Sequence, residues 1–469
     1  MIAAISALSA PRRGAARVGA AGLVSGLLAA GALAGAGPAA AEEAAPSQSG
    51  ATATMGGLKT YGSAVIHGDA GDQQVPAGLF EMSVEGGGTL QTYCVDLYHP
   101  TQRDARYHET PWSGTSLGAN KDAGRIRWIL QNSYPQVNDL AALARKAGVR
   151  GALTEQDAAA GTQVAIWRYS DQAHVDALDP QAEQLADYLH KNARDLPEPR
   201  ASLSLTPAAV AGSPGERLGP VTVRTNARGV TVTPPADAAT SGVRIVDKTG
   251  KAVTSAVDGS QVFFEVPKDA AAGTAELSVQ ASTTVPVGRA FAADGRSQTQ
   301  ILAGSSASTV SAAAHATWGE RGAIPALSAA KNCAKGGVDV TAVNQGDTPY
   351  TFELAGTEHT VAAGETRTVT LPLPEDQAYD LTVRGPGGLE QRFTGMLDCR
   401  VQGAESGAGT QTLSDPSPAT VVTPTSPTNL AATGASSTTP WIAGTAITLV
   451  VLGGAALLIV RRGETTAGE

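Results

Sequence analysis

Basic charge is in short supply along this chain of 469 residues. Its 34 Lys and Arg are outnumbered by 43 Asp and Glu, which gives a formal net charge of −9 at pH 7, and no segment concentrates the basic residues into a patch. Proteins bind the phosphates of nucleic acids mainly through such basic patches. We therefore expect no nucleic acid partner.

Metal-binding motifs are also missing from the sequence. The seven His residues are scattered, and neither an H-E-x-x-H motif nor paired C-x-x-C motifs occur. The segment DAGDQQVPAG contains Asp but lacks the Asp/Asn ladder and the terminal Glu of an EF-hand loop. We therefore predict neither a metal ion nor a cofactor.

Aromatic residues make up only 4% of the chain, whereas Val, Thr, Ala and Gly are abundant. This composition suits small β-sandwiches exposed to solvent. Between the two terminal segments described next lie roughly 390 residues, enough for two to four domains with cores of their own.

The N-terminal segment has the pattern of a secretory signal. Three Arg residues between positions 12 and 17 precede the apolar run VGAAGLVSGLLAAGALAGAG, and an A-x-A site ends at Ala41. A basic start, an apolar middle and such a site are typical of a cleaved signal peptide, here residues 1–41. The alternative is an N-terminal membrane anchor. Under either interpretation the protein is exported.

The C-terminal segment, residues 430–469, contains an apolar run at 441–460 that is long enough to span a bilayer and is followed by two Arg residues. Before it stands a pentapeptide that resembles the LPxTG-type sorting signals of Gram-positive bacteria, in the LAxTG variant: Leu430, Ala431, Ala432, Thr433 and Gly434. The resemblance implies that a sortase cuts after Thr433 and joins it to peptidoglycan. The alternative is a plain single-pass anchor, and in both cases the folded part lies outside the cell.

Three folded regions are predicted between these ends. Residues 58–196 begin with strand-like segments and continue with four helical patterns, so we predict an α+β domain; the helical patterns cover residues 121–135, 138–148, 154–171 and 179–195. Residues 200–318 repeat short alternating strands between Gly, Pro and Asp turns, which favours an Ig-like β-sandwich. Residues 331–400 repeat that style on a smaller scale. A Pro/Ser/Thr-rich spacer follows at 401–429.

Three cysteines in an exported protein leave at least one thiol without an intramolecular partner. Three pairings are possible. Cys333 and Cys399 bracket the smallest domain, where closing the loop is worth about 4 to 5 kcal/mol in the chain-entropy model, so we favour that disulfide. Cys94 is then a free thiol exposed to oxidation, which is a liability unless the thiol has a use.

A second unusual residue lies in the helical pattern at 154–171. Thr154 can cap its start, and Asp157 follows three positions later. Gln163 falls on the apolar stripe of this helix, together with residues such as Ile166 and Trp167. A carboxamide buried among apolar side chains costs about 1–3 kcal/mol unless it is satisfied.

The chemistry of Cys94 matches that of Gln163. A thiolate can attack a carboxamide carbon, expel ammonia and leave an internal thioester. Sulfur donates poorly into the carbonyl, so the product is far more electrophilic than the amide. The bond would remove the unsatisfied amide and protect the thiol until a suitable nucleophile arrives.

These motifs resemble the thioester domains of Gram-positive surface adhesins. Those domains carry a Cys preceded by an aromatic residue and, later, a TQxA(I/V)W motif whose Gln closes the bond with that Cys. The matching positions are Tyr93 and Cys94 in TYCVDL, and Thr162, Gln163, Ala165, Ile166 and Trp167 in TQVAIW. The resemblance covers roughly residues 58–195. The downstream sandwiches match only the stalk architecture of such adhesins.

The resemblance implies that a Lys amine of a partner surface displaces Cys94 and becomes linked to Gln163. The reaction occurs once, so the protein is a covalent binder rather than an enzyme. Trp167 packs over the bond or belongs to the ordinary core, and Tyr93 should point to the opposite face of its strand. His99 or His108 could accept the proton of the attacking ammonium, although we favour an ordinary surface or core histidine as the interpretation of each.

Two other functions remain open from the sequence. Cys94 could be the nucleophile of a cysteine peptidase or transpeptidase with one of the two histidines as base, although TQVAIW would then have no explanation. Alternatively, the protein is a passive wall protein whose Cys94 is incidental.

Overall fold

The computed structural model describes residues 49–69, 71–386 and 389–400. The signal predicted at 1–41, the spacer at 401–429 and the sorting signal at 430–469 lie outside these residues. None of the helices described is long and apolar enough to cross a membrane. The span predicted at 441–460 also lies outside the described part of the chain.

A seven-stranded antiparallel sheet underlies the N-terminal region. Its strands, in spatial order, are β3 (Gln73–Val84), β4 (Thr89–Cys94), β16 (Gln300–Ser305), β15 (Ala290–Ala293), β5 (Arg106–Thr110), β2 (Thr52–Ile66) and β6 (Val175–Ala177). Because β2 also pairs with β3, the ladder closes on itself and leaves only β6 outside the ring. Closure removes the exposed edges that an open sheet would have.

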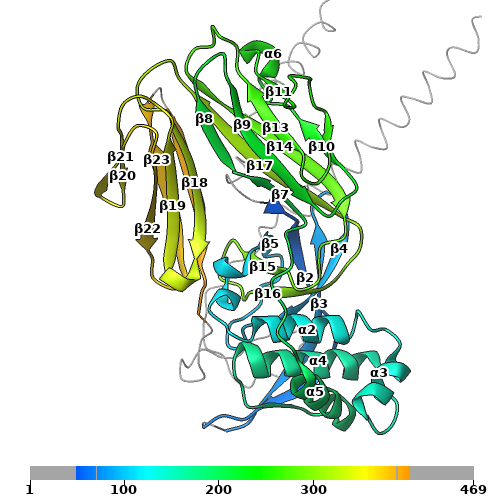
Figure 1. Ribbon diagram of the computed structural model, residues 1–469. Coiled ribbons are helices and arrows are strands. Elements are labelled where there is room, and N and C mark those ends of the chain that lie inside the picture. Colours follow the sequence, from blue (N-terminus) through cyan, green and yellow to red (C-terminus); the bar gives the residue numbers. More distant parts are fainter. Residues whose placement is uncertain (1–48, 70, 387–388, 401–469) are drawn as a thin grey trace, which may run out of the picture. The chain divides into compact units, whose positions relative to one another are not determined.

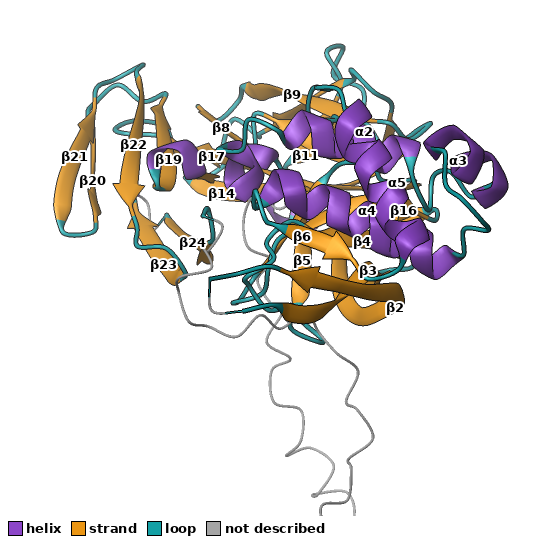
Figure 2. Ribbon diagram, turned by 90° about the horizontal axis from the view of Figure 1, so that it is seen from below, coloured by secondary structure: helices purple, strands orange, loops and turns teal. Residues whose placement is uncertain are grey.

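Four helices accompany this ring, and all four coincide with the predicted helical patterns: α2 (Ala123–Asn132), α3 (Leu140–Ala147), α4 (Glu155–Ser170) and α5 (Pro180–Asn192). Helices α2, α4 and α5 lie side by side, and α4 contacts strands β2 and β3 (Figures 1 and 2). The predicted cap is confirmed, since the Thr154 hydroxyl accepts from the Asp157 amide and the Asp157 carboxylate accepts from the Thr154 amide.

Helix α4 is buried on nearly all sides rather than along one stripe, because strands cover one face and α5 packs on another. Gly161 makes the close approach to α5 possible: a Cβ atom at this position would lie 2.4 Å from the carbonyl oxygen of Ala182. The small residues of this helix therefore hold Gln163 deep inside the domain.

Two further sheets form a second β region. One contains β1 (Ser49–Gly50), β17 (Ser308–Trp318), β14 (Gly273–Thr283), β10 (Val230–Thr233) and β12 (Ser255–Ala256), with β8 (Ala209–Gly212) beside β17. The other contains β11 (Arg244–Val246), β13 (Gln261–Glu265), β9 (Arg217–Thr225) and β7 (Leu203–Thr206). The short helix α6 (Ala238–Ser241) lies between β10 and β11 in the chain. Alternate residues of these strands, such as Val221 and Leu277, are buried, as the period-two pattern predicts.

The structure corrects the predicted boundaries of these two regions. Strands β15 and β16 fall within residues 200–318, yet they pair with β5 and β4 of the preceding region. At the other end, β1 and the start of β2 precede residue 58, and β1 pairs with β17. The chain thus passes from the N-terminal region into the second region, where it forms β7 to β14, and then returns to the ring with β15 and β16. Short alternating strands do not reveal which sheet they join, so the sequence placed them with their neighbours.

The third β region has its own core, built around Val338, Val340, Tyr350 and Phe352. Its strands are β18 (Pro325–Asn332), β19 (Gly337–Asn344), β20 (Tyr350–Leu354), β21 (Thr357–Val361), β22 (Thr366–Pro372), β23 (Gln377–Arg384) and β24 (Glu390–Leu397). It begins a few residues before the predicted boundary at 331. The structure contains the predicted Cys333–Cys399 disulfide, and Cys94 is a free thiol.

Candidate functional site

Cys94 and Gln163 lie against each other in the interior of the N-terminal region. Cys94 is the last residue of β4, and Gln163 lies in the middle of α4; both are fully buried. The Cys94 amide donates a hydrogen bond to Gln163 Oε1 at 3.0 Å, and Gln163 Nε2 donates to the Cys94 carbonyl oxygen at 2.9 Å. The carboxamide is therefore held against the backbone of the residue that carries the thiol.

This pairing satisfies both halves of the buried amide and fixes which way it faces. Gln163 Oε1 meets a donor and Nε2 meets an acceptor, so a flipped amide would lose both bonds. In the structure, Cys94 has a free thiol and Gln163 has an intact carboxamide. Two hydrogen bonds thus hold the Gln163 carboxamide against the backbone of Cys94.

The sulfur atom of Cys94 has polar neighbours from outside the predicted motif. Gln300 Nε2 donates to Cys94 Sγ at 3.3 Å, and Thr101 Oγ1 lies 3.7 Å from the same sulfur. Burial raises the pKa of the Cys94 thiol to about 12, while the contacts with Gln300 and Thr101 act in the opposite direction. Hydrogen bonds from Gln300 and Thr101 therefore favour the thiolate form of Cys94, whereas burial opposes it.

Gln300 comes from β16, which lies next to β4 in the ring. Its backbone is in register with Cys94, so the two side chains project on the same face of the sheet. Sequence reasoning missed this residue because the four polar residues 297–300 resemble a loop, although all four are buried. Only the pairing of β4 with β16, across about two hundred residues, reveals it.

The remaining motif residues are part of the core. Thr162, Ala165, Ile166 and Trp167 are buried, and the Thr162 hydroxyl donates to the carbonyl of the preceding helical turn. The indole nitrogen of Trp167 has no hydrogen-bond partner among the described residues. Tyr93 is also buried, and its hydroxyl donates to a backbone carbonyl oxygen after α2, at Tyr134.

The two histidines considered as bases are paired with carboxylates instead. His99 Nδ1 lies 3.2 Å from Asp96, and His108 Nε2 lies 2.9 Å from Asp294. In the part of the chain that the structure describes, neither imidazole forms a hydrogen bond with Cys94 or Gln163. The described structure therefore gives neither histidine a hydrogen bond through which it could accept a proton at Cys94 or Gln163.

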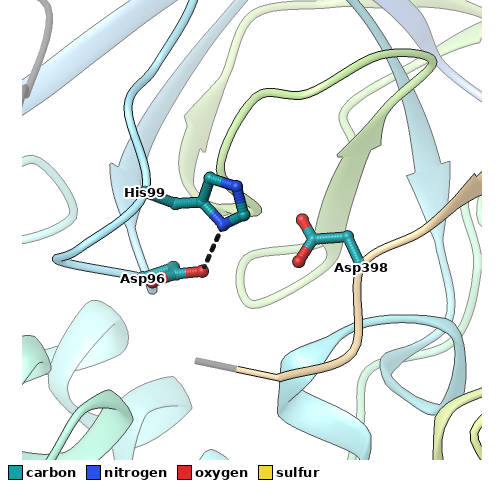
Figure 3. A group of neighbouring side chains, drawn as sticks. All are labelled: Asp96, His99 and Asp398. Carbon is teal, nitrogen blue, oxygen red and sulfur yellow. Dashed lines mark hydrogen bonds and ion pairs between the residues drawn. The ribbon is translucent and has the colours of Figure 1, made fainter. Parts of the chain in front are cut away.

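A charged cluster begins two residues after Cys94 and extends to the third β region. One oxygen or nitrogen atom from each of Asp96, His99 and Asp398 lies within 4.8 Å of the others (Figure 3). The Asp96 carboxylate raises the pKa of His99 to about 9, and burial next to Asp96 raises the pKa of Asp398 to about 7. The Asp96 charge also opposes ionisation of the Cys94 thiol. Sequence spacing could not reveal this group, because Asp398 is about three hundred residues away.

Comparison with known proteins agrees with this site. The thioester domain family matches residues 91–195, a segment that includes both Cys94 and Gln163. The family described as the C-terminal domain of bacterial phospholipase C matches residues 320–396, which lie in the third β region. No curated protein matches the chain.

Solved structures show distant likenesses. The Bacillus anthracis TIE protein is 14% identical, with 75% of this chain and 81% of that chain covered and a TM-score of 0.27. The thioester domain of the Enterococcus faecium TIE86 protein is 16% identical, with 58% and 97% covered and a TM-score of 0.27. The Escherichia coli chaperone DraB is 15% identical, with 42% and 98% covered and a TM-score of 0.18.

Proposed function

We propose that Cys94 and Gln163 form an internal thioester. This thioester reacts once with an amine on a partner surface and so attaches the protein to that surface covalently. The observation that supports this most is the double hydrogen bond between the Gln163 carboxamide and the Cys94 backbone. It ties the carboxamide that would be attacked to the backbone of the residue that carries the thiol. The thioester domain family match supports a thioester-based covalent-binding role.

The same hydrogen bonds suggest how the bond forms. Attack of the Cys94 sulfur on the Gln163 carbon makes a tetrahedral intermediate with negative charge on Oε1. The Cys94 amide, 3.0 Å from that oxygen, is the donor that stabilises the charge. The C–N bond then breaks, ammonia leaves with the proton of the thiol, and the C–S bond remains.

The reaction with a partner reverses the roles of nucleophile and leaving group. An amine attacks the acyl carbon, a C–N bond forms, the C–S bond breaks, and the proton of the amine passes to the sulfur of Cys94. A Lys ε-amine on a protein is the nucleophile that fits this chemistry. Since both residues are fully buried, the attacking amine must enter through an opening of the domain. The thiol is regenerated but the acyl group is not, so each molecule acts once and is not a catalyst.

The cellular role follows from the predicted ends of the chain. We propose a secreted surface adhesin that a sortase anchors to peptidoglycan through Thr433, with the β regions carrying the thioester domain away from the wall. The alternative of a cysteine peptidase has less support, because among the described residues neither His99 nor His108 forms a hydrogen bond with the thiol. The passive wall protein leaves the pairing of Cys94 with Gln163 unexplained.

Intact mass measurement of protein purified without reductant or amines tests the proposal. We expect a deficit of one ammonia in the wild type, and no deficit in Cys94→Ala or Gln163→Ala. Methylamine should add to the wild type alone and should be found on Gln163. A full-mass wild type that does not take up methylamine would contradict the proposal, and turnover of a peptide substrate would favour the peptidase.

A further inference from the structure

We infer that Gln300 is a catalytic residue that assists the formation and the cleavage of the thioester at Cys94. It lies on β16, outside the segment that matches the thioester domain family. This inference rests on the proposed function and concerns how the sulfur is activated. Among the described residues after position 200, only Gln300 forms a hydrogen bond with the Cys94 sulfur. Its Nε2 lies 3.3 Å from Cys94 Sγ. It touches a reacting atom directly.

The orientation of the Gln300 amide is set by its neighbours. Thr92 Oγ1 donates to Gln300 Oε1 at 2.9 Å, so the carbonyl half is occupied and the N–H half faces the sulfur. A second acceptor for Gln300 Nε2, Thr101 Oγ1, lies 3.3 Å away. These three residues and Cys94 are all buried, so bulk solvent does not compete for the N–H donor of Gln300. The donor is therefore preorganised.

An N–H donor at this position stabilises negative charge on the sulfur, and both steps of the proposed chemistry need that charge. During thioester formation, Cys94 attacks as a thiolate while the C–S bond forms and ammonia departs. During reaction with an amine, the C–S bond breaks and its electron pair stays on the sulfur, which then takes the proton of the amine. Gln300 keeps its own protons throughout and acts by hydrogen bonding alone.

The matched control lies two residues earlier in the chain. Gln298 is the same residue type and equally buried, but its side-chain amide atoms have no hydrogen-bond partner among the described residues and therefore form no hydrogen bond with Cys94. Replacing either glutamine by Met removes a buried amide of similar size. Only the replacement of Gln300 removes the donor from the sulfur.

The full chain is compared as wild type, Gln300→Met and Gln298→Met, using the rate at which methylamine adds to the protein. Hydrogen bonds to charged groups are strong enough that we expect Gln300→Met to react about tenfold more slowly or worse. Gln298→Met should react within about twofold of wild type, since its amide is not tied to the sulfur. Equal rates for wild type and Gln300→Met, with equal stability to urea, would overturn the inference.

Thr92→Val provides a second variant if Gln300→Met does not fold. It frees the carbonyl half of Gln300 and should slow methylamine addition by a smaller factor than loss of the amide. A rate unchanged from wild type would show that the orientation of Gln300 is irrelevant and would contradict the inference.

A separate measurement distinguishes failure of this inference from failure of the proposed function. In the Gln163→Ala background no thioester can form, so alkylation of Cys94 reports on the thiol itself. Adding Gln300→Met should shift the pH dependence of alkylation upward, because the thiolate loses a donor. If this shift occurs but wild type shows no ammonia deficit, the contact is real and the proposed function fails. If the deficit occurs without any shift, the inference fails alone.

Discussion

The buried ion pair between Glu109 and Arg289 offers a quantitative test of how the N-terminal region is assembled. Arg289 Nε lies 2.8 Å from Glu109 Oε1, and the two side chains are 5% and 0% exposed. Glu109 also accepts from the backbone amides of Ala51 and Ser202. The Glu109 carboxylate thus links three segments: the junction of β1 and β2 at Ala51, the segment before β7 at Ser202, and Arg289 directly before β15.

Arg289→Met removes the positive charge but leaves Glu109 buried. The two backbone donors remain, yet nothing neutralises the carboxylate, and removing one partner of such a pair costs about 3–5 kcal/mol. That is a large part of the total free energy of unfolding of an ordinary domain, about 5–15 kcal/mol. Replacing both residues with apolar ones should cost less than Arg289→Met alone, because no uncompensated charge is then left inside.

Urea unfolding of the single and double variants measures these differences. The exposed pair Arg384–Glu390, whose side chains are 75% and 58% exposed, supplies the control, and Arg384→Met should cost about 1 kcal/mol or less. A cost of Arg289→Met no larger than that of the control would refute the reasoning. It would mean that β15 does not pack into the ring as described, and the position of Gln300 on the next strand would lose its support.

Three further predictions follow from other parts of the chain. Replacing Cys333 and Cys399 by Ser opens a loop with a sequence separation of 66 and should lower the stability of the third β region by about 4 kcal/mol, measured by thermal unfolding; an unchanged melting temperature would contradict this. Gly161→Ala should destabilise the thioester domain by about 1–3 kcal/mol in urea, because its Cβ would overlap the Ala182 carbonyl, whereas a neutral effect would mean that α4 and α5 are farther apart. The carboxylate beside His99 raises the pKa of this histidine from 6.5 to about 9, so its contribution to stability is complete below pH 6.5 and is lost as the pH rises to 9; His99→Gln should flatten this decline in the free energy of unfolding, and an identical pH profile would rule the pair out.

The sequence predicted the local features of the site well. All four helices are predicted from helical patterns between Pro and Gly boundaries, and for one of them the pairing of Thr154 with Asp157 is visible as a capping box. Cys94 and Gln163 were matched because a spare thiol and a buried amide each needed an explanation. Signals of this kind are short in range or depend on the chemistry of single residues, so a sequence can carry them.

The features that escaped prediction all depend on pairing between distant segments. Strands β15 and β16 have no local signal that assigns them to the ring rather than to the second region. Gln300 acquires its role only through the register of β16 with β4, and Asp398 meets His99 only in the folded chain. Alternation of residue types shows that a strand has two faces, but it does not show what the strand pairs with.

An experimental electron density map of protein purified without reductant or amines tests the central claim most directly. We expect continuous density between Cys94 Sγ and the side-chain carbonyl carbon of Gln163, with the amide nitrogen gone. An intact Gln163 carboxamide that still donates to the Cys94 carbonyl, beside a free sulfur, would contradict it.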